Sequence, residues 1–242
     1  MSDKLDIITI GESLIELSTS ENLTTATNLY KYYGGDTLTT AIAALRLGSK
    51  VGFISRIGMD CFKDYLLESW QEEGLDISHV KPVQGINGLY MVSKTQDGLS
   101  KEFSFYRKKT AATNLSIEDI STEYIQNSSM LYTTGITQSL SISAREAVKE
   151  AFKIAKENGI MTAYDPNYTA KIWTEDEATE AFNDIAEYID IIFMNERYDS
   201  KVVIDSESRD NAVKYMWDKG ISTVILKSAE EKGYYVGSQG KT

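Results

Sequence analysis

The sequence predicts an α/β fold, in which a doubly wound, mostly parallel sheet carries helices on both faces. Short runs rich in β-branched residues alternate with longer amphipathic runs along most of the 242 residues. Such alternation is typical of successive βαβ units. Hydrophobic residues make up 42% of the chain and charged residues 25%, which is the composition of an ordinary globular protein.

Strands are expected wherever a short apolar run is followed by a polar residue or a glycine. These runs cover residues 5–10, 50–54, 130–134, 160–164, 190–194 and 223–226. Helices are expected between them, because apolar residues recur there at helical spacing, as in 38–45 before Gly48, 148–155 and 211–219. Ligands collect at the carboxyl ends of parallel strands, so the residues that follow these strands are the first site candidates.

Two stretches interrupt this alternation, because they carry β-forming residues without a helical period. They span 14–35 and 80–109, which leaves 1–13, 36–79 and 110–242 for the α/β core. The turn signal Gln96-Asp97-Gly98 predicts a hairpin within the second stretch. We expect a small antiparallel sheet that acts as a lid or pairs with a second copy in a homo-oligomer. An edge extension of the main sheet is the alternative.

Charge and composition exclude several classes of protein. Lysine and arginine number 25 against 36 aspartate and glutamate residues, a net charge of −11, which argues against nucleic-acid binding because phosphates require a basic face. One cysteine and one histidine allow neither an internal disulfide nor a Cys/His zinc site. The sequence begins without the features of a signal peptide and has no apolar run long enough to span a membrane. We therefore expect a cytoplasmic protein.

The first candidate site precedes the helical pattern that starts near residue 38. Gly34 and Gly35 allow close backbone approach, and a helix start offers free N–H groups. Asp36 has two interpretations: it holds a hydroxyl-rich ligand, or it only caps the helix.

A basic cluster, Tyr106-Arg107-Lys108-Lys109, follows the predicted hairpin. The planar guanidinium of Arg107 suits two-pronged contact with a carboxylate. Lys108 and Lys109 are expected to be solvated residues at a strand end.

Further candidates follow three other predicted strands. Asp165 and Asn167 have groups that bind a metal, a water or a substrate hydroxyl, or that shape an Asx turn. Asn195, with Glu196 beside it, suggests outer-sphere Mg²⁺ coordination near a nucleotide. Lys227 suggests a phosphate or ribose contact.

Together these markers resemble the ribokinase-like (PfkB) carbohydrate kinases. The resemblance rests on the Gly34-Gly35 pair with the helix up to Ala41 and on matches spread along the chain: Gly11-Glu12, Gly48, Arg56 to Asp60, Gly74 to Asp76, and Asp165 to Asn167. Within the family, Tyr90, Phe103 to Arg107 and Gly135 to Ser141 look most like 2-keto-3-deoxygluconate kinase.

The resemblance implies a kinase, a transferase that uses ATP and Mg²⁺ to convert the sugar acid 2-keto-3-deoxygluconate to its 6-phosphate. It implies substrate contacts from residues of the lid and of the strand ends: Gly34, Gly35, Asp36, Tyr90, Tyr106, Arg107, Asp165 and Asn167. Asn195 and Lys227 are expected on the nucleotide side.

The sequence also departs from the family pattern. Thr39, Thr169 and Tyr198 stand where the family has Asn, Arg and Glu. The Gly-Ala-Gly-Asp motif, whose Asp is the family's catalytic base, does not occur, so no catalytic residue is assigned and a C-terminally truncated fold is expected. We expect this chain alone to be inactive. The alternatives are a non-catalytic sugar-binding pseudokinase, a gene remnant and a fructokinase-like hexose kinase.

Overall fold

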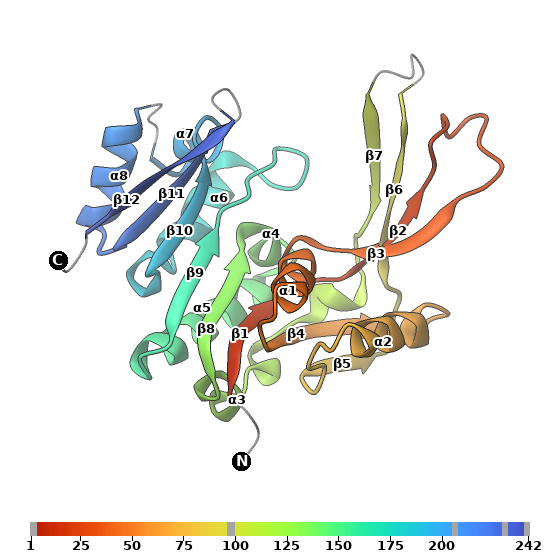
Figure 1. Cartoon of the computed structure of the whole chain (residues 1–242), viewed down its shortest axis with the longest axis horizontal. Coiled ribbons are helices and arrows are strands. Elements are labelled where there is room, and N and C mark those ends of the chain that lie inside the picture. The colour runs from red at the N-terminus through yellow and green to blue at the C-terminus, as the bar shows by residue number, and fades with distance from the viewer. Residues whose placement is uncertain (1–3, 96–99, 205–207, 229–231, 240–242) are drawn as a thin grey trace.

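The computed structural model describes residues 4–95, 100–204, 208–228 and 232–239. Within these residues the strands form one sheet of eight strands and one of four, with the helices packed around the larger sheet (Figure 1). The predicted class, an α/β fold with a small second sheet, is confirmed. No helix in this part of the chain is both long enough and apolar enough to cross a membrane.

The large sheet has the strand order β12-β11-β10-β9-β8-β1-β4-β5. Its strands are β1 (Leu5–Ile10), β4 (Val51–Gly58), β5 (Val80–Val83), β8 (Ser128–Thr134), β9 (Met161–Asp165), β10 (Ile191–Asn195), β11 (Thr223–Ser228) and β12 (Gly233–Ser238). β12 pairs antiparallel with β11, whereas the other neighbouring pairs are parallel. The carboxyl ends of the parallel strands therefore meet along one edge.

Helices cover both faces of this sheet. On one side lie α1 (Asp36–Arg46) and α2 (Lys63–Glu72). The other elements are α3 (Thr122–Gln126), α4 (Gly135–Gln138), α5 (Ile142–Glu157), α6 (Glu175–Asn183), α7 (Asp199–Ile204) and α8 (Arg209–Asp218), with short 3-10 helices at Ala111–Asn114 (η1), Ile117–Asp119 (η2) and Ala186–Tyr188 (η3). α1 ends just before Gly48, whose φ of 99° is the left-handed conformation that favours glycine after a helix.

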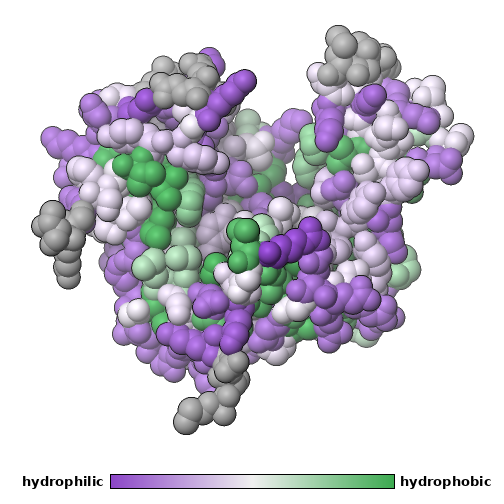
Figure 2. Space-filling view, in the orientation of Figure 1, coloured by the Kyte–Doolittle hydropathy of each residue, from purple (hydrophilic) through white to green (hydrophobic). Residues whose placement is uncertain are grey.

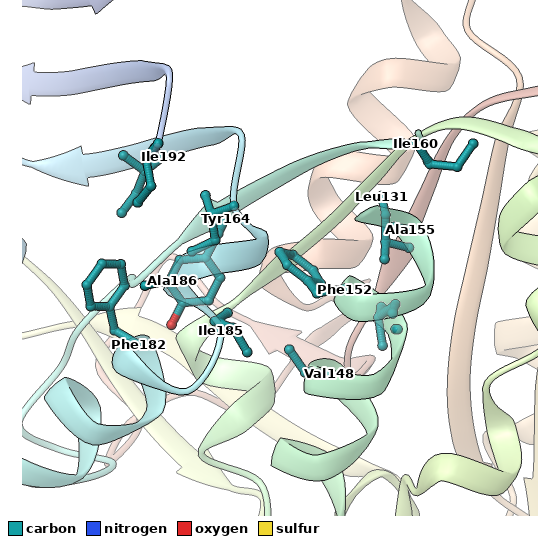
Figure 3. Packing of buried hydrophobic residues seen from close by; sticks show 14 of the residues in the cluster. Leu131, Val148, Phe152, Ala155, Ile160, Tyr164, Phe182, Ile185, Ala186 and Ile192 are labelled. Carbon is teal, nitrogen blue, oxygen red and sulfur yellow. The ribbon is translucent and has the colours of Figure 1, made fainter. Parts of the chain in front are cut away.

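The two faces of the sheet bury two separate hydrophobic clusters. In the larger one, Val148, Phe152 and Ala155 of α5 pack against β8, β9 and the segment that follows α6 (Figure 3). These residues recur at the helical spacing that predicted α5, so the predicted apolar face is the buried face. In the smaller cluster, the rings of Trp70 and Phe53 meet edge-on at 5.7 Å between centroids.

The small sheet has the strand order β3-β2-β6-β7. It consists of β2 (Leu14–Ser18), β3 (Tyr30–Gly34), β6 (Gly88–Lys94) and β7 (Lys101–Tyr106). β6 and β7 pair antiparallel as the predicted hairpin requires, and its turn at residues 96–98 lies outside the described residues. β2 and β6, however, pair in parallel, so the sheet is mixed rather than purely antiparallel.

One boundary of the predicted lid segment differs from the structure. Residues 80–83, assigned to the small sheet with the rest of 80–109, form β5 and pair in parallel with β4. The physical reason is burial, because Val80 packs into the cluster that contains Phe53 and Trp70.

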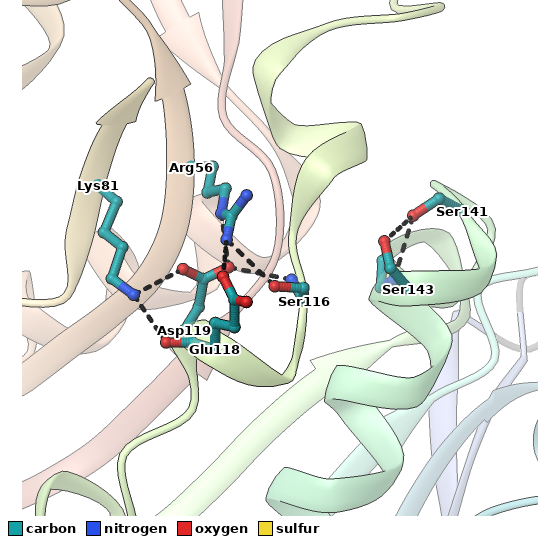
Figure 4. Close-up of polar contacts among 8 residues, drawn as sticks. Arg56, Lys81, Ser116, Glu118, Asp119, Ser141 and Ser143 are labelled. Carbon is teal, nitrogen blue, oxygen red and sulfur yellow. Dashed lines mark hydrogen bonds and ion pairs between the residues drawn. The ribbon is translucent and has the colours of Figure 1, made fainter. Parts of the chain in front are cut away.

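A polar network fastens this edge of the large sheet to η2 (Figure 4). The carboxylate of Asp119, which is fully buried, receives Arg56 Nε at 2.6 Å and Lys81 Nζ at 2.9 Å. The backbone N–H of Ser116 also donates to this carboxylate, at 3.0 Å. Two cations and one N–H group therefore compensate the burial of one charge.

Candidate functional site

An open cavity of about 1150 Å³ lies between the carboxyl edge of the large sheet and the small sheet. Figure 2 shows the molecule hollowed between the small sheet and the strands β9–β12. Among the predicted substrate residues, those that line this cavity are Gly35, Asp36, Tyr90, Tyr106 and Arg107. Gly34, Asp165 and Asn167 do not line the cavity. Instead, each contacts another residue of the protein, as described below.

Gly35 and Asp36 connect β3 to α1 at the floor of the cavity. Gly35 has a φ of 129°, and a Cβ at this position would lie 2.4 Å from the carbonyl oxygen of Glu12, so only glycine fits. Asp36 Oδ1 accepts a hydrogen bond from the N–H of Thr37 at 2.8 Å. Its Oδ2 accepts from the hydroxyl of Thr134 and, at 3.3 Å, from Asn167 Nδ2. Asp36 therefore accepts a hydrogen bond from an N–H in the first turn of α1 and also lines the cavity, and its contact with a hydroxyl-rich ligand stays a prediction.

Asn167 and Gly34 support this floor instead of forming its surface. The N–H of Asn167 donates to Asp165 Oδ1 at 3.0 Å, which is the predicted Asx turn. Gly34 lies under the ring of Tyr90, because a Cβ on Gly34 would come within 2.4 Å of the Tyr90 hydroxyl oxygen.

Aromatic side chains from β6 and β7 form the wall on the side of the small sheet. Tyr90 stacks on Phe105 with 5.7 Å between ring centroids, and its hydroxyl donates to Glu16. Burial and this carboxylate raise the pKa of Tyr90 well above its usual value, so it stays a neutral hydrogen-bonding group. Such rings supply an apolar face against which a sugar ring or chain packs.

Arg107 pairs with Glu12, a residue that the sequence indicated only as part of a motif. The two side chains are 12% and 2% exposed. Burial raises the pKa of Glu12 to about 7; Arg107 lowers it and Asp36 raises it further. The Oε2 atom of Glu12 has no hydrogen-bond partner among the described residues. The sequence feature that could have identified Glu12 as a site residue is its position just after the carboxyl end of β1.

Three lysines line the same cavity. Lys108 and Lys109 are exposed, as predicted for solvated residues, yet they face the ligand space. Lys171, which the sequence analysis did not select, lies two residues beyond Thr169 in the loop after β9 and also lines the cavity. The sequence feature that could have identified Lys171 is its closeness to the carboxyl end of β9.

The side chains predicted for a nucleotide are engaged within the protein. Lys227 Nζ lies 2.5 Å from Asp165 Oδ2, and burial raises the pKa of Asp165 to about 6 although Lys227 lowers it. Asn195 Oδ1 accepts hydrogen bonds from the N–H groups of Arg197 and Tyr198 at 3.0 and 3.1 Å.

Glu196, which the sequence places beside Asn195 in the predicted magnesium site, also has a partner within the protein. Glu196 forms an ion pair with Arg209, and nowhere in the described ranges do three or more His, Cys, Asp or Glu side chains group so as to hold a metal ion. The expectation that Asn195 and Lys227 face a nucleotide stays a prediction, and the structure adds that each side chain already has a partner within the protein.

The profile of the pfkB family of carbohydrate kinases matches residues 4–242. The chain belongs to this family. The 5-dehydro-2-deoxygluconokinase of Clostridium perfringens is 28% identical to this chain over 240 residues, which cover 94% of this chain and 70% of the relative. The 2-dehydro-3-deoxygluconokinase of Bacillus subtilis is 28% identical over 238 residues, which cover 96% and 72%.

A solved structure gives the same result for the fold of this chain. The PfkB protein of Polaromonas sp. JS666 superposes with a TM-score of 0.91 at 26% identity, over 97% of this chain and 80% of that protein. Thr39 and Thr169, where the sequence departs from the family pattern, both line the cavity, whereas Tyr198 is 62% exposed. Two of the departures therefore lie in the wall of the candidate site, and the third lies on the surface of the protein.

Proposed function

We propose that the cavity binds a sugar acid of the dehydro-deoxygluconate class. The observation that carries this proposal is the charge of the cavity, where four cationic side chains outnumber the two carboxylates of Glu12 and Asp36 although the whole chain has a net charge of −11. The four are Arg107, Lys108, Lys109 and Lys171. A local concentration of cations in an acidic protein attracts an anionic ligand. Two relatives named as kinases of such sugar acids support the same substrate class.

In the proposed pose, Arg107 and Lys171 hold the acid group from opposite walls. Arg107 extends from the end of β7 and Lys171 from the loop after β9. The hydroxyl groups of the ligand face Asp36 and the backbone beside Gly35, and its carbon chain lies against Tyr90 and Phe105. Lys171 would supply a second cation in place of the arginine that the family carries where this chain has Thr169.

Kinases of this family transfer phosphate from ATP with Mg²⁺ to a sugar hydroxyl. We propose that this chain alone retains sugar-acid binding without catalysing that transfer. The supporting observations are the contacts of Lys227 with Asp165 and of Asn195 with a neighbouring turn, which occupy the side chains expected to face ATP. A coupled assay of ADP formation with the acid, ATP and Mg²⁺ should give no turnover above background. Sustained turnover by the purified chain would overturn this part of the proposal.

Calorimetric titration with 2-dehydro-3-deoxygluconate, with fructose as the neutral comparison, tests the substrate class. Arg107→Ala should weaken acid binding by about 10- to 100-fold, since a hydrogen bond to a charged group contributes about 1.5–3 kcal/mol. Lys171→Met should weaken it less, because Lys171 is exposed. Lys153→Met, an exposed lysine on α5, is the matched control. Equal affinity for fructose and the acid, or no effect of Arg107→Ala, would reject the sugar-acid assignment.

We also propose that a second copy of the chain covers one face of the small sheet. The strand registers place Tyr32 and Phe105 on the same face as Tyr90, and the exposed fractions of Tyr32 and Phe105 are 52% and 48%. Sedimentation analysis should show a dimer that Phe103→Glu weakens, because Phe103 lies on the same face, whereas Ser104→Glu on the opposite face should not. A monomer at high concentration would contradict this proposal.

A further inference from the structure

Glu12 is a buried carboxylate in the wall of the cavity that the proposed binding of a sugar acid leaves without a role. Its side chain is 2% exposed, it lines the cavity, and its Oε2 atom accepts no hydrogen bond from the described residues. A buried carboxylate oxygen without a donor is costly. The position of this atom therefore calls for an explanation.

The charges around Glu12 define the problem. Arg107 forms its ion pair from the end of β7, and Asp36 faces it from the start of α1 as a like charge. The remaining cations of the cavity among the described residues are Lys108, Lys109 and Lys171. In the unliganded site, Glu12 is therefore the anion that partners Arg107, at the place where a ligand carboxylate would bind.

We propose that Glu12 is a positioning residue that holds Arg107 in the unliganded site and takes up a proton when a sugar acid binds beside Arg107. This inference rests on the proposed function. The proton comes from the acid form of the buffer, whose bond to that hydrogen breaks to leave the conjugate base, and it forms one O–H bond on Glu12. The protonated Glu12 keeps Arg107 in place without competing for its charge, and its O–H group is available to a ligand oxygen.

The physical basis is the effect of a second anion on a buried carboxyl group. Burial already raises the pKa of Glu12 to about 7, even with Arg107 beside it. A ligand carboxylate close to Arg107 weakens that compensation and adds like-charge repulsion, and both effects raise the pKa further. Above about pH 7.5, Glu12 is ionised in the free site and protonated in the complex. Binding should then weaken by about tenfold for each unit of rising pH.

The test is isothermal titration of the purified chain with 2-dehydro-3-deoxygluconate at pH 8, in phosphate, HEPES and Tris. The slope of the observed enthalpy against the ionisation enthalpy of the buffer gives the number of protons taken up. We expect the uptake of close to one proton per bound ligand for the wild type and close to none for Glu12→Gln. At pH 8.5, Glu12→Gln should bind the acid more tightly than the wild type. Glu16→Gln, which alters a carboxylate that accepts from Tyr90, is the matched control and should keep the proton uptake.

The outcomes separate this inference from the function on which it rests. Acid binding by the wild type without proton uptake would overturn the role of Glu12 and leave the proposed function standing. A merely structural role would give weaker binding in Glu12→Gln at every pH, which would also overturn the inference. Should Glu12→Gln not fold, the buffer series on the wild type still decides. Absence of any acid binding would overturn both proposals.

Discussion

Replacing Lys227 by methionine should destabilise the fold, because it removes the partner of a buried carboxylate. Lys227 Nζ lies 2.5 Å from Asp165 Oδ2, and the two side chains are 36% and 12% exposed. Removing one partner of a fully buried ion pair costs about 3–5 kcal/mol. Because solvent screens the partly exposed lysine, we expect a smaller loss in the free energy of unfolding, about 2 kcal/mol at pH 8.

The loss should depend on pH through Asp165. Burial raises its pKa to about 6 from an ordinary value of 3.8, although Lys227 lowers it. The folded chain therefore binds this proton more tightly than the unfolded chain, so the contribution of Asp165 to stability falls as pH rises from about 4 to about 6. Without Lys227 the pKa of Asp165 rises further, so in the variant the contribution of Asp165 to stability continues to fall through neutral pH. At pH 5 the carboxyl is protonated in the folded variant, and the cost of the substitution should fall below about 1 kcal/mol.

Urea unfolding followed by circular dichroism at pH 5 and pH 8 measures both effects. The proteins compared are the wild type, Lys227→Met, Asp165→Asn and the double variant. The double variant should recover most of the stability that Lys227→Met loses at pH 8, because the uncompensated charge is gone. An equal loss at both pH values, or a double variant no more stable than Lys227→Met, would refute the reasoning. Wild-type stability of Lys227→Met would show that Lys227 is free for another partner.

Three further predictions follow from the packing. Phe152→Ala, at a fully buried ring 6.5 Å from that of Tyr164, should cost about 3–5 kcal/mol in urea unfolding; a loss below about 1 kcal/mol would contradict the buried position. Asp119→Asn should destabilise by about 2–4 kcal/mol, since it removes the buried carboxylate that Arg56 and Lys81 share. Glu118→Gln, at a side chain 88% exposed, should leave the melting temperature nearly unchanged. Gly35→Ala should lower that temperature by about 4 °C or more, because the added Cβ meets the carbonyl oxygen of Glu12; an unchanged melt would count against the close approach.

The elements of the core could be predicted because their signals are local. The spacing of Val148, Ala151 and Ala155 lies within one contiguous segment, and the structure buries that face of α5. The placement of β5 could not be predicted in the same way. Residues 80–83 are compatible with either sheet, and only their long-range pairing with β4 and the burial of Val80 decide between them.

The candidate site likewise has features that local sequence signals predict and features that depend on tertiary contacts. By itself, the sequence determined the α/β class, the separate small sheet and the residues at strand ends and in the hairpin that form much of the cavity, because these follow from local periodicity and a recognisable set of motifs. Only the tertiary structure decided which charges meet. Glu12 with Arg107 and Asp165 with Lys227 are far apart in the chain, and they pair because the sheet topology brings their segments together in space. That topology leaves Arg107 and Lys171 in the cavity and commits Lys227 to Asp165, a distinction that residue types alone do not contain.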